Sequence, residues 1–218
     1  MTIARGTLLG RILRAAVLGL AVAVASTAEP LLPNGDFATA DPEEARKPVA
    51  WQFPDGVGAA WLDAPGGGKG IRLDTRVSEV AMNDAWNAIG LEDFLIPKPA
   101  TTAMAEFYGL SYYSDPVVIE AGRSYRLSYE FQGPAAGVKV WLRGYGELKR
   151  ADGSVEQRKL WESVVAGVGD GEGWHAVEHT TNPTKHRPAV RTVRVMLYAY
   201  WPATVYWFRN VRLEAVAE

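Results

Sequence analysis

Several stretches of the chain alternate between hydrophobic and polar residues. The alternation is strict in Ser124–Phe131 (SYRLSYEF) and in Gly137–Tyr145 (GVKVWLRGY), and it recurs in Val190–Tyr200. Val205–Leu213 (VYWFRNVRL) is a further run rich in β-branched and aromatic residues. A period of two with such residues is typical of half-buried antiparallel strands. The pattern therefore predicts antiparallel strands in these stretches.

Glycine, proline and aspartate separate the predicted strands. Asp152-Gly153 predicts a hairpin turn, because glycine accepts a positive φ. Residues 77–115 are the least regular part, and Ser78–Ala88 within them predicts a short helix with Ser78 as its N-cap. Short strands at this spacing predict an all-β antiparallel sandwich of the jelly-roll type, with one short helix or irregular excursion around 77–115.

The first 28 residues have the features of a secretory signal peptide. Three arginines precede the uncharged run Ala15–Ala25, and small residues stand at positions −3 and −1 of a cleavage after Ala28. The apolar run is shorter than the roughly 20 residues that cross a bilayer. We therefore expect a single mature domain, residues 29–218, that is secreted or periplasmic and does not span the membrane. An uncleaved signal anchor is the alternative.

Charge and cysteine content exclude several classes of function. The 218 residues include 23 Lys and Arg and 25 Asp and Glu, which gives a formal net charge of −2. Nucleic-acid binding needs clustered cations, so no nucleic-acid partner is expected. The chain has no cysteine, which excludes disulfides, thiolate metal sites and a thiol nucleophile. Stability must therefore come from one hydrophobic core, which a chain of this length can form.

Three tryptophans are predicted to pack in the core, because tryptophan is highly buried on average. Trp51 and Trp61 flank short predicted strands. Trp207 has the same phase in the alternation as Val205 and Val211.

Three segments, in chain order, resemble carbohydrate-binding modules with the galactose-binding-like jelly roll. Leu31–Phe37 (LLPNGDF), followed by Pro48–Trp51 (PVAW), resembles their N-G-D/N-F-E…G-W opening. Gly122–Tyr129 (GRSYRLSY) resembles a G-x-x-Y-x-L-S-[FY] strand, and Val205–Leu213 resembles the closing strand Y-[FI]-D-D-V-x-L. The resemblance spans nearly the whole mature chain. It implies a jelly roll that binds a polysaccharide or another glycan, although this fold hosts many functions.

The resemblance also implies a structural calcium ion, and two positions of this chain disfavour one. The ligands in such modules include the acid after the opening motif and an aspartate of the closing strand. Those positions hold Ala38 and Arg209 here. Calcium binds several oxygen ligands, usually including carboxylates, and an arginine opposes a cation. We therefore expect no calcium ion there, or a weakened site, and no other cofactor or metal ligand. We expect Arg209 to pair with Asp36 instead.

The candidate glycan site is the polar and aromatic face of the strands. If the apolar residues between Val138 and Leu142 point into the core, their neighbours point outward together. Aromatic rings stack on the C–H faces of sugars, and charged planar groups bind hydroxyls in fixed geometry. The predicted ligand-binding residues are Trp141, Arg143, Tyr145, Arg126, Glu130, Tyr198 and Tyr200, with Trp86, Tyr112 and Tyr113 as a candidate rim. The alternative is that residues 77–115 cover Trp141 and Tyr145 as a second core layer.

No catalytic motif is found in the sequence, and we expect no catalytic residue. His175 and His179 lie in a strand-like stretch, where they would be about 13 Å apart and too distant to share a metal. A glycosidase would need a carboxylate pair about 5 to 10 Å apart, for which Glu130 and Glu147 are candidates. A polysaccharide lyase would use Tyr145 as a base with Arg143 neutralising a uronate. These two enzyme classes stay open as alternatives.

A third alternative is a structural or assembly domain at the cell surface, which an exposed apolar patch would mark.

Overall fold

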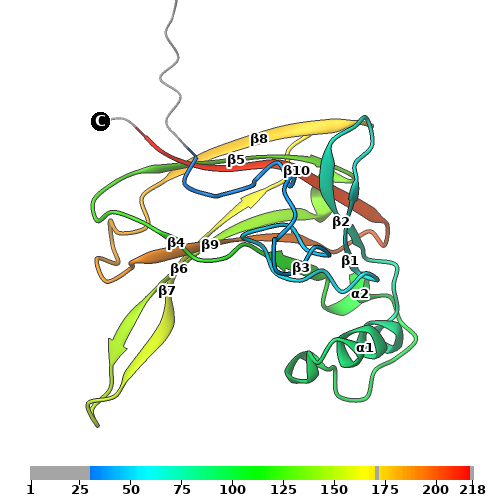
Figure 1. Ribbon diagram of the computed structural model, residues 1–218, viewed down its shortest axis with the longest axis horizontal. Coiled ribbons are helices and arrows are strands. Elements are labelled where there is room, and N and C mark those ends of the chain that lie inside the picture. The colour runs from blue at the N-terminus through cyan, green and yellow to red at the C-terminus, as the bar shows by residue number, and fades with distance from the viewer. Residues whose placement is uncertain (1–29, 170–171, 217–218) are drawn as a thin grey trace, which may run out of the picture.

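Two antiparallel β-sheets pack face to face in the computed structural model, which describes residues 30–169 and 172–216 (Figure 1). The first sheet contains, in spatial order, β1 (Ala59–Asp63), β2 (Lys69–Asp74), β10 (Val205–Ala215), β5 (Tyr125–Gln132) and β8 (Trp174–Thr181). The second sheet contains β3 (Leu110–Tyr113), β9 (Thr192–Ala199), β6 (Val138–Lys149) and β7 (Val155–Ala166), and β4 (Val117–Val118) pairs with β9. The predicted all-β sandwich of the jelly-roll type is confirmed.

The alternating strands place one face of each sheet in a shared core. In β5, Tyr125, Leu127, Tyr129 and Phe131 are buried, and in β6 the apolar residues from Val138 to Leu142 are buried in the same way. Full burial of a large apolar side chain stabilises the folded state by about 1.5–3 kcal/mol. The hydrophobic pattern thus gave the inward faces of β5 and β6 correctly.

Two local predictions are confirmed. The helix α1 spans Glu79–Ala88, and its N-cap Ser78 accepts a hydrogen bond from the backbone N–H of Ala81 at 3.3 Å. The predicted hairpin turn joins β6 to β7, with Gly153 at φ 86°. The other short helical segments are η1 (Glu92–Phe94), α2 (Met104–Phe107) and η2 (Ala135–Gly137).

The prediction that Trp207 lies in the core is wrong. A bulge interrupts the pairing of β10 with β5 between Arg209 and Arg212, where Asn210 adopts φ 51°. A bulge adds one residue to a strand and reverses the alternation beyond it. Phe208 and Val211 are therefore both buried, and Trp207 lies half-buried on the outer face.

The other two tryptophans lie as predicted. Trp51 is fully buried. Trp61 is half-buried, packs against the core and donates a hydrogen bond from Nε1 to the carbonyl oxygen of Phe37 at 2.9 Å.

The Asn34–Phe37 segment of the opening motif forms a structural corner. The side-chain amide of Asn34 donates to the carbonyl oxygens of Thr39 and Val49, and its Oδ1 accepts from the N–H of Thr39. Phe37 is fully buried with its ring centroid 4.7 Å from that of Trp51. The residues that carry the family resemblance at this end therefore stabilise the fold.

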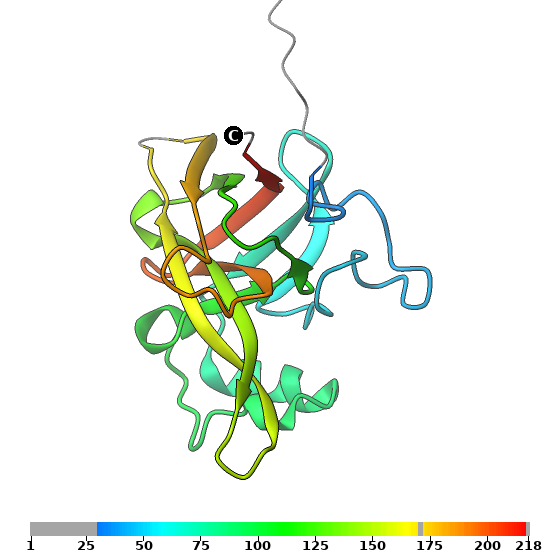
Figure 2. The same ribbon diagram turned by 90° about the vertical axis from the view of Figure 1, so that its left-hand side faces the viewer.

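Two segments project from the outer face of the second sheet. One is the far end of the β6–β7 hairpin, and the other contains α1 and η1 (Figure 1). The view turned by 90° shows both on the same side of the sandwich (Figure 2). This sheet face therefore lies between two projections.

Within residues 30–169 and 172–216, the helices are too short or too polar to cross a membrane. The predicted signal peptide, residues 1–28, lies outside the described residues.

Candidate functional site

The predicted ligand-binding residues divide between two opposite outer faces, so the expectation of a single face is wrong. The chain passes from the first sheet to the second between β5 and β6, and alternation within a strand does not show such a crossing. Arg126 and Glu130 lie on the outer face of the first sheet, whereas Trp141, Arg143, Tyr145, Tyr198 and Tyr200 belong to the second.

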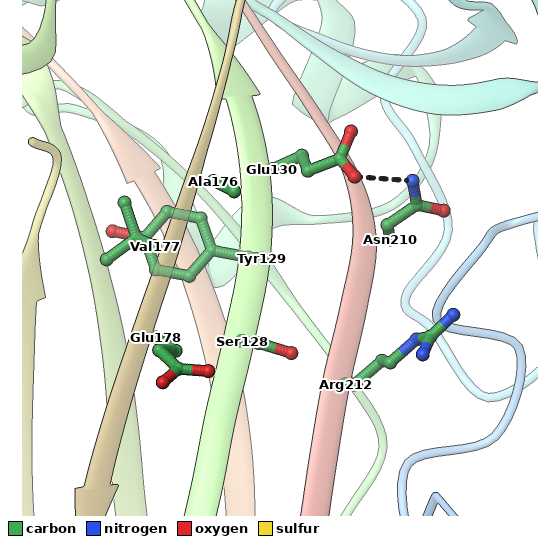
Figure 3. Close-up of a pocket in the computed structure, with 8 residues that line it drawn as sticks. All are labelled: Ser128, Tyr129, Glu130, Ala176, Val177, Glu178, Asn210 and Arg212. Atoms are coloured by element: carbon green, nitrogen blue, oxygen red, sulfur yellow. Dashed lines mark hydrogen bonds between the residues drawn. The ribbon is translucent and has the colours of Figure 1, made fainter. Parts of the chain in front are cut away.

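On the first sheet, Glu130 is held by two neighbours on β10. Its Oε2 accepts from Nε of Arg209 at 2.7 Å. Its Oε1 accepts from Nδ2 of Asn210 at 3.0 Å, and Figure 3 shows this second contact. The Arg209 guanidinium also lies 3.9 Å from the ring centroid of Trp174. The predicted pairing of Arg209 with Asp36 is therefore wrong. The opposite carboxylate on the adjacent β5 strand is the closer partner, and Asp36 accepts from the N–H of Ala38 instead.

This hydrogen-bonded group predicts a pH-dependent contribution to stability. Partial burial raises the pKa of Glu130, but the hydrogen bonds from Arg209 and Asn210 outweigh it and hold the pKa below its usual range. A lowered pKa in the folded state stabilises the protein above the unfolded-state pKa of about 4.3, and this stabilisation is lost as the pH falls through the folded-state value. We expect Glu130→Gln to lower the free energy of unfolding by about 1–2 kcal/mol at neutral pH.

Urea unfolding of the parent and of Glu130→Gln checks this expectation. The difference between the two proteins should shrink as the pH falls below about 4, because the parent then loses the same charge. Glu147→Gln, at an exposed position of the β6–β7 hairpin, is the matched control and should change little. A difference between parent and Glu130→Gln that is equal at neutral and acidic pH would contradict the assigned role.

A shallow pocket of about 410 Å³ adjoins Glu130 between β5, β8 and β10 (Figure 3). Its walls include Ser128, Glu178, Asn210 and Arg212. The ring that contributes to it, Tyr129, is 1% exposed and belongs to the core. The pocket therefore has polar groups that could contact a sugar, but it has no exposed aromatic ring.

A larger cleft of about 730 Å³ lies on the outer face of the second sheet, against residues 86–110. Neighbouring strands supply its floor, with Tyr113 from β3, Arg194 from β9 and Tyr145 from β6. The opposite wall contains three aromatic side chains: Trp86 from α1, Phe94 from η1 and Tyr108 after α2. Phe94 is 66% and Tyr108 is 51% exposed, so the wall presents aromatic rings to solvent.

Arginines and aromatic rings interleave on this outer face, where Tyr113 and Arg194 line the cleft and Trp141 and Arg143 are not among the described residues that line it. The Arg143 guanidinium lies 5.8 Å from the ring centroid of Tyr113 and 5.5 Å from that of Trp141, and Arg194 lies 5.2 Å from the same Tyr113 ring. Arg143 donates from Nη1 to the Tyr113 hydroxyl at 2.7 Å, and Arg194 donates from Nε to the carbonyl oxygen of Ser114 at 2.7 Å. Cation–π contacts of this kind stabilise by about 0.5–1 kcal/mol at exposed sites. They fix these side chains before any ligand arrives.

Tyr198 attaches the wall to the sheet. Its hydroxyl donates to the carbonyl oxygen of Tyr108 at 2.8 Å, and its ring stacks on Tyr200 with centroids 5.7 Å apart. Burial raises the pKa of Tyr198, and the neighbouring Tyr200 raises it further. Tyr198 therefore holds the wall in place, while Lys139 lies over the Tyr200 ring at 4.7 Å.

Of the three candidate rim residues, Trp86 and Tyr113 line the cleft, and their contact with a glycan stays a prediction. Tyr112 is fully buried, stacks on Trp51 and donates from its hydroxyl to the carbonyl oxygen of Gln52, so its place in the rim was wrong. Sequence reasoning did not select Arg194, Phe94 or Tyr108. Only Arg194 had a visible signal, because it alternates with buried valines on a predicted strand.

Two alternatives from the sequence are contradicted. Residues 86–110 form one wall of the cleft and leave Tyr145 partly exposed at its floor, so they do not bury it as a second core layer. Glu130 lies on β5 in the first sheet, and Glu147 lies on β6 in the second, where the hairpin projects away. Glu130 also uses both carboxylate oxygens in hydrogen bonds. These two glutamates therefore do not form a glycosidase pair.

No cluster of three or more potential metal-ligating side chains occurs in residues 30–169 and 172–216. His175 and His179 lie on β8, which confirms that this stretch is a strand.

No family model matches the sequence, and no curated protein matches it. Among solved structures, the chain is similar to TmCBM61 in complex with β-1,4-galactotriose, at 15% identity and a TM-score of 0.42, over 88% of this chain and 100% of that one. It is also similar to the CBM22-1 xylan-binding domain from Paenibacillus barcinonensis Xyn10C, at 11% identity and a TM-score of 0.40, over 88% and 97% of the two chains.

The enzymatically active domain of bacteriophage CBA120 tailspike protein 4 is similar at 7% identity and a TM-score of 0.46. That match covers 86% of this chain and 21% of the tailspike chain. Most of the similar structures are carbohydrate-binding modules, as the resemblance in the sequence predicted. At these identities the likeness is one of fold.

Proposed function

We propose that the protein is an exported, non-catalytic glycan-binding module, and that it binds sugar in the cleft on the second sheet. The observation that carries the proposal is the combination of exposed rings on the wall with the fixed Arg194 on the floor. Sugars are bound by such surfaces because rings stack on their C–H faces and guanidinium groups bind their oxygens. The cleft volume of about 730 Å³ is within the range of small-molecule sites.

The chemistry of the cleft favours binding over hydrolysis. Among the described residues that line it, Asp55 is the one carboxylate. Its Oδ1 accepts three hydrogen bonds, from the backbone N–H groups of Val57, Gly58 and Ala59, so it caps a turn. Glycosidases use two carboxyl groups on either side of the scissile bond. Export rests on the predicted signal peptide.

A matched pair of phenylalanine variants tests the location of the site. Phe94 and Phe107 are 66% and 71% exposed, but Phe94 lines the cleft and Phe107 does not. We expect Phe94→Ala to weaken binding about 3- to 10-fold, which corresponds to the loss of one aromatic contact. Phe107→Ala should bind as the parent does.

A glycan array identifies the ligand, and affinity electrophoresis of the parent and the two variants on that glycan gives the comparison. If the parent binds no glycan, the proposed function is wrong. If both variants lose affinity equally, the site is not the cleft.

The same protein tests the lyase alternative. Tyr145 lines the cleft, and Arg143 lies on the same strand. Incubation with polyuronides, followed by ultraviolet absorbance of unsaturated products, should show no cleavage. If unsaturated products form with the parent and not with Tyr145→Phe, the protein is a lyase and the proposal of a non-catalytic module is wrong.

A further inference from the structure

Arg143 and Arg194 stand directly opposite each other on neighbouring strands of the second sheet. Like charges in this position destabilise a sheet. The Tyr113 ring lies within 6 Å of both guanidinium groups and offsets part of that repulsion. The two arginines concentrate positive charge at the floor of the cleft, because Arg194 lines it and Arg143 lies beside it.

The nearby carboxylates do not balance this charge. Glu162 on β7 is opposite Arg143, but its Oε2 is 3.6 Å from Nε of Arg143 and 2.6 Å from Nζ of Lys159. Nε of Arg143 is buried and makes no hydrogen bond among the described residues. Glu162 is therefore shared by two cations and bound more closely by the lysine.

Arg194 forms no ion pair with any described residue. Asp55 in the cleft accepts hydrogen bonds from three backbone N–H groups of its own turn. Asp115, which follows Ser114, forms no ion pair with Arg194. The Nε of Arg194 is used on Ser114, while its two Nη atoms make no hydrogen bond within the described part of the chain. These atoms remain available to a ligand that enters the cleft.

The outer face of the first sheet differs in part. Arg209 pairs with Glu130 at 2.7 Å, and Arg126 pairs with Glu214 at 2.7 Å. These two arginines have carboxylates on the adjacent strand, whereas Arg212 on the same face forms no ion pair with a described residue. Two arginines that stand directly opposite each other occur on the face that carries the aromatic cleft.

We propose that Arg194, with the positive charge of Arg143 opposite it, binds the acidic group of an anionic glycan, as the carboxylate of a uronic acid residue or as a sulfate ester. The inference rests on the proposed function and specifies its ligand class. A guanidinium group binds such planar or oxyanionic groups through two parallel N–H donors, and the fixed orientation of Arg194 prepares this geometry. The rings of Tyr113 and Tyr145 beside it then contact the sugar that carries the acid.

Isothermal titration calorimetry with defined polymers tests the inference. The probes are polygalacturonate, its methyl ester, and dextran sulfate. We expect Arg194→Gln to weaken binding of polygalacturonate about 10- to 100-fold, because a hydrogen-bonded charge pair is lost. Binding of the methyl ester should stay unchanged. Arg194→Lys should recover only part of the affinity, because it keeps the charge without the planar fork.

Arg212→Gln is the matched control, since Arg212 is an exposed arginine on the opposite face. It should bind all three polymers as the parent does. Binding of dextran sulfate instead of polygalacturonate, with the same loss in Arg194→Gln, supports the acid site and identifies sulfate as the group.

Three results would overturn the inference. Equal affinity of the parent for polygalacturonate and its methyl ester would show that charge is not recognised, while glycan binding itself would stand. An equal loss in Arg194→Gln and Arg212→Gln would show that the effect is nonspecific. A parent that binds neither these polymers nor any neutral glycan on an array would overturn the proposed function as well.

Discussion

Replacement of Trp51 with alanine is expected to lower the free energy of unfolding by about 3–5 kcal/mol. The side chain is 0% exposed, its ring lies 4.7 Å from that of Phe37, and it stacks on Tyr112 at 5.8 Å with an interplanar angle of 11°. Its Nε1 also donates to the carbonyl oxygen of Asn34 at 3.3 Å. The variant would leave a cavity where the opening motif, β3 and the core meet.

Urea denaturation followed by circular dichroism measures this loss without depending on tryptophan fluorescence. Phe107→Ala, at a position 71% exposed, is the control and should change the free energy of unfolding by less than about 0.5 kcal/mol. A loss below about 1 kcal/mol in Trp51→Ala would show that the surrounding side chains close the cavity or that Trp51 is not at the centre of the core.

The inward face of each regular strand could be predicted from the sequence because it depends on neighbouring residues alone. Tyr125 to Phe131 on β5 and Val138 to Leu142 on β6 illustrate this, as does the Ser78 cap of α1. The bulge at Asn210 could not be predicted in the same way. An extra residue in one strand is recognised only from its pairing with the neighbouring strand. The sequence pattern therefore assigned Trp207 and Val211 to the same face, although the bulge at Asn210 lies between them.

The candidate site depends on information of longer range. Alternation shows that Arg126 and Arg143 point away from the core, but it does not show that β5 and β6 lie in different sheets. The wall of the cleft comes from an irregular segment, in which no period gives the direction of Phe94 or Tyr108. Strand partners and tertiary packing, rather than local pattern, determine which exposed residues meet.

The arginines on the two outer faces have different kinds of partner. On the first sheet, ion pairs between adjacent strands and the contact of Arg209 with Trp174 use the polar groups internally. On the second sheet, Arg194 retains free donors beside exposed rings. Two arginines directly opposite each other destabilise a sheet in the absence of a ligand, and this pair lies beside the cleft of the second sheet.

A second large effect is expected from Gly35→Ala in the opening motif. A Cβ on Gly35 would collide with the backbone carbonyl oxygen of Val211, and the two residues are also joined by a hydrogen bond from the N–H of Val211 to the oxygen of Gly35 at 2.8 Å. Val211 is fully buried and lies within the β10 bulge, so neither backbone can move without disturbing the core. We expect a loss of at least about 3 kcal/mol in the free energy of unfolding, at the upper end for overpacking.

Gly56→Ala separates this collision from the general cost of replacing glycine. Gly56 has φ 80° and no atom within 4 Å of an added Cβ, so alanine there is expected to cost only about 1–2 kcal/mol for the left-handed backbone. In thermal and urea unfolding, the free energy of unfolding of Gly35→Ala should therefore be well below that of Gly56→Ala. The reverse order would mean that the corner at Asn34 and Gly35 is not packed against Val211. In that case the resemblance in the opening motif would need an explanation other than the close contact of these two backbones.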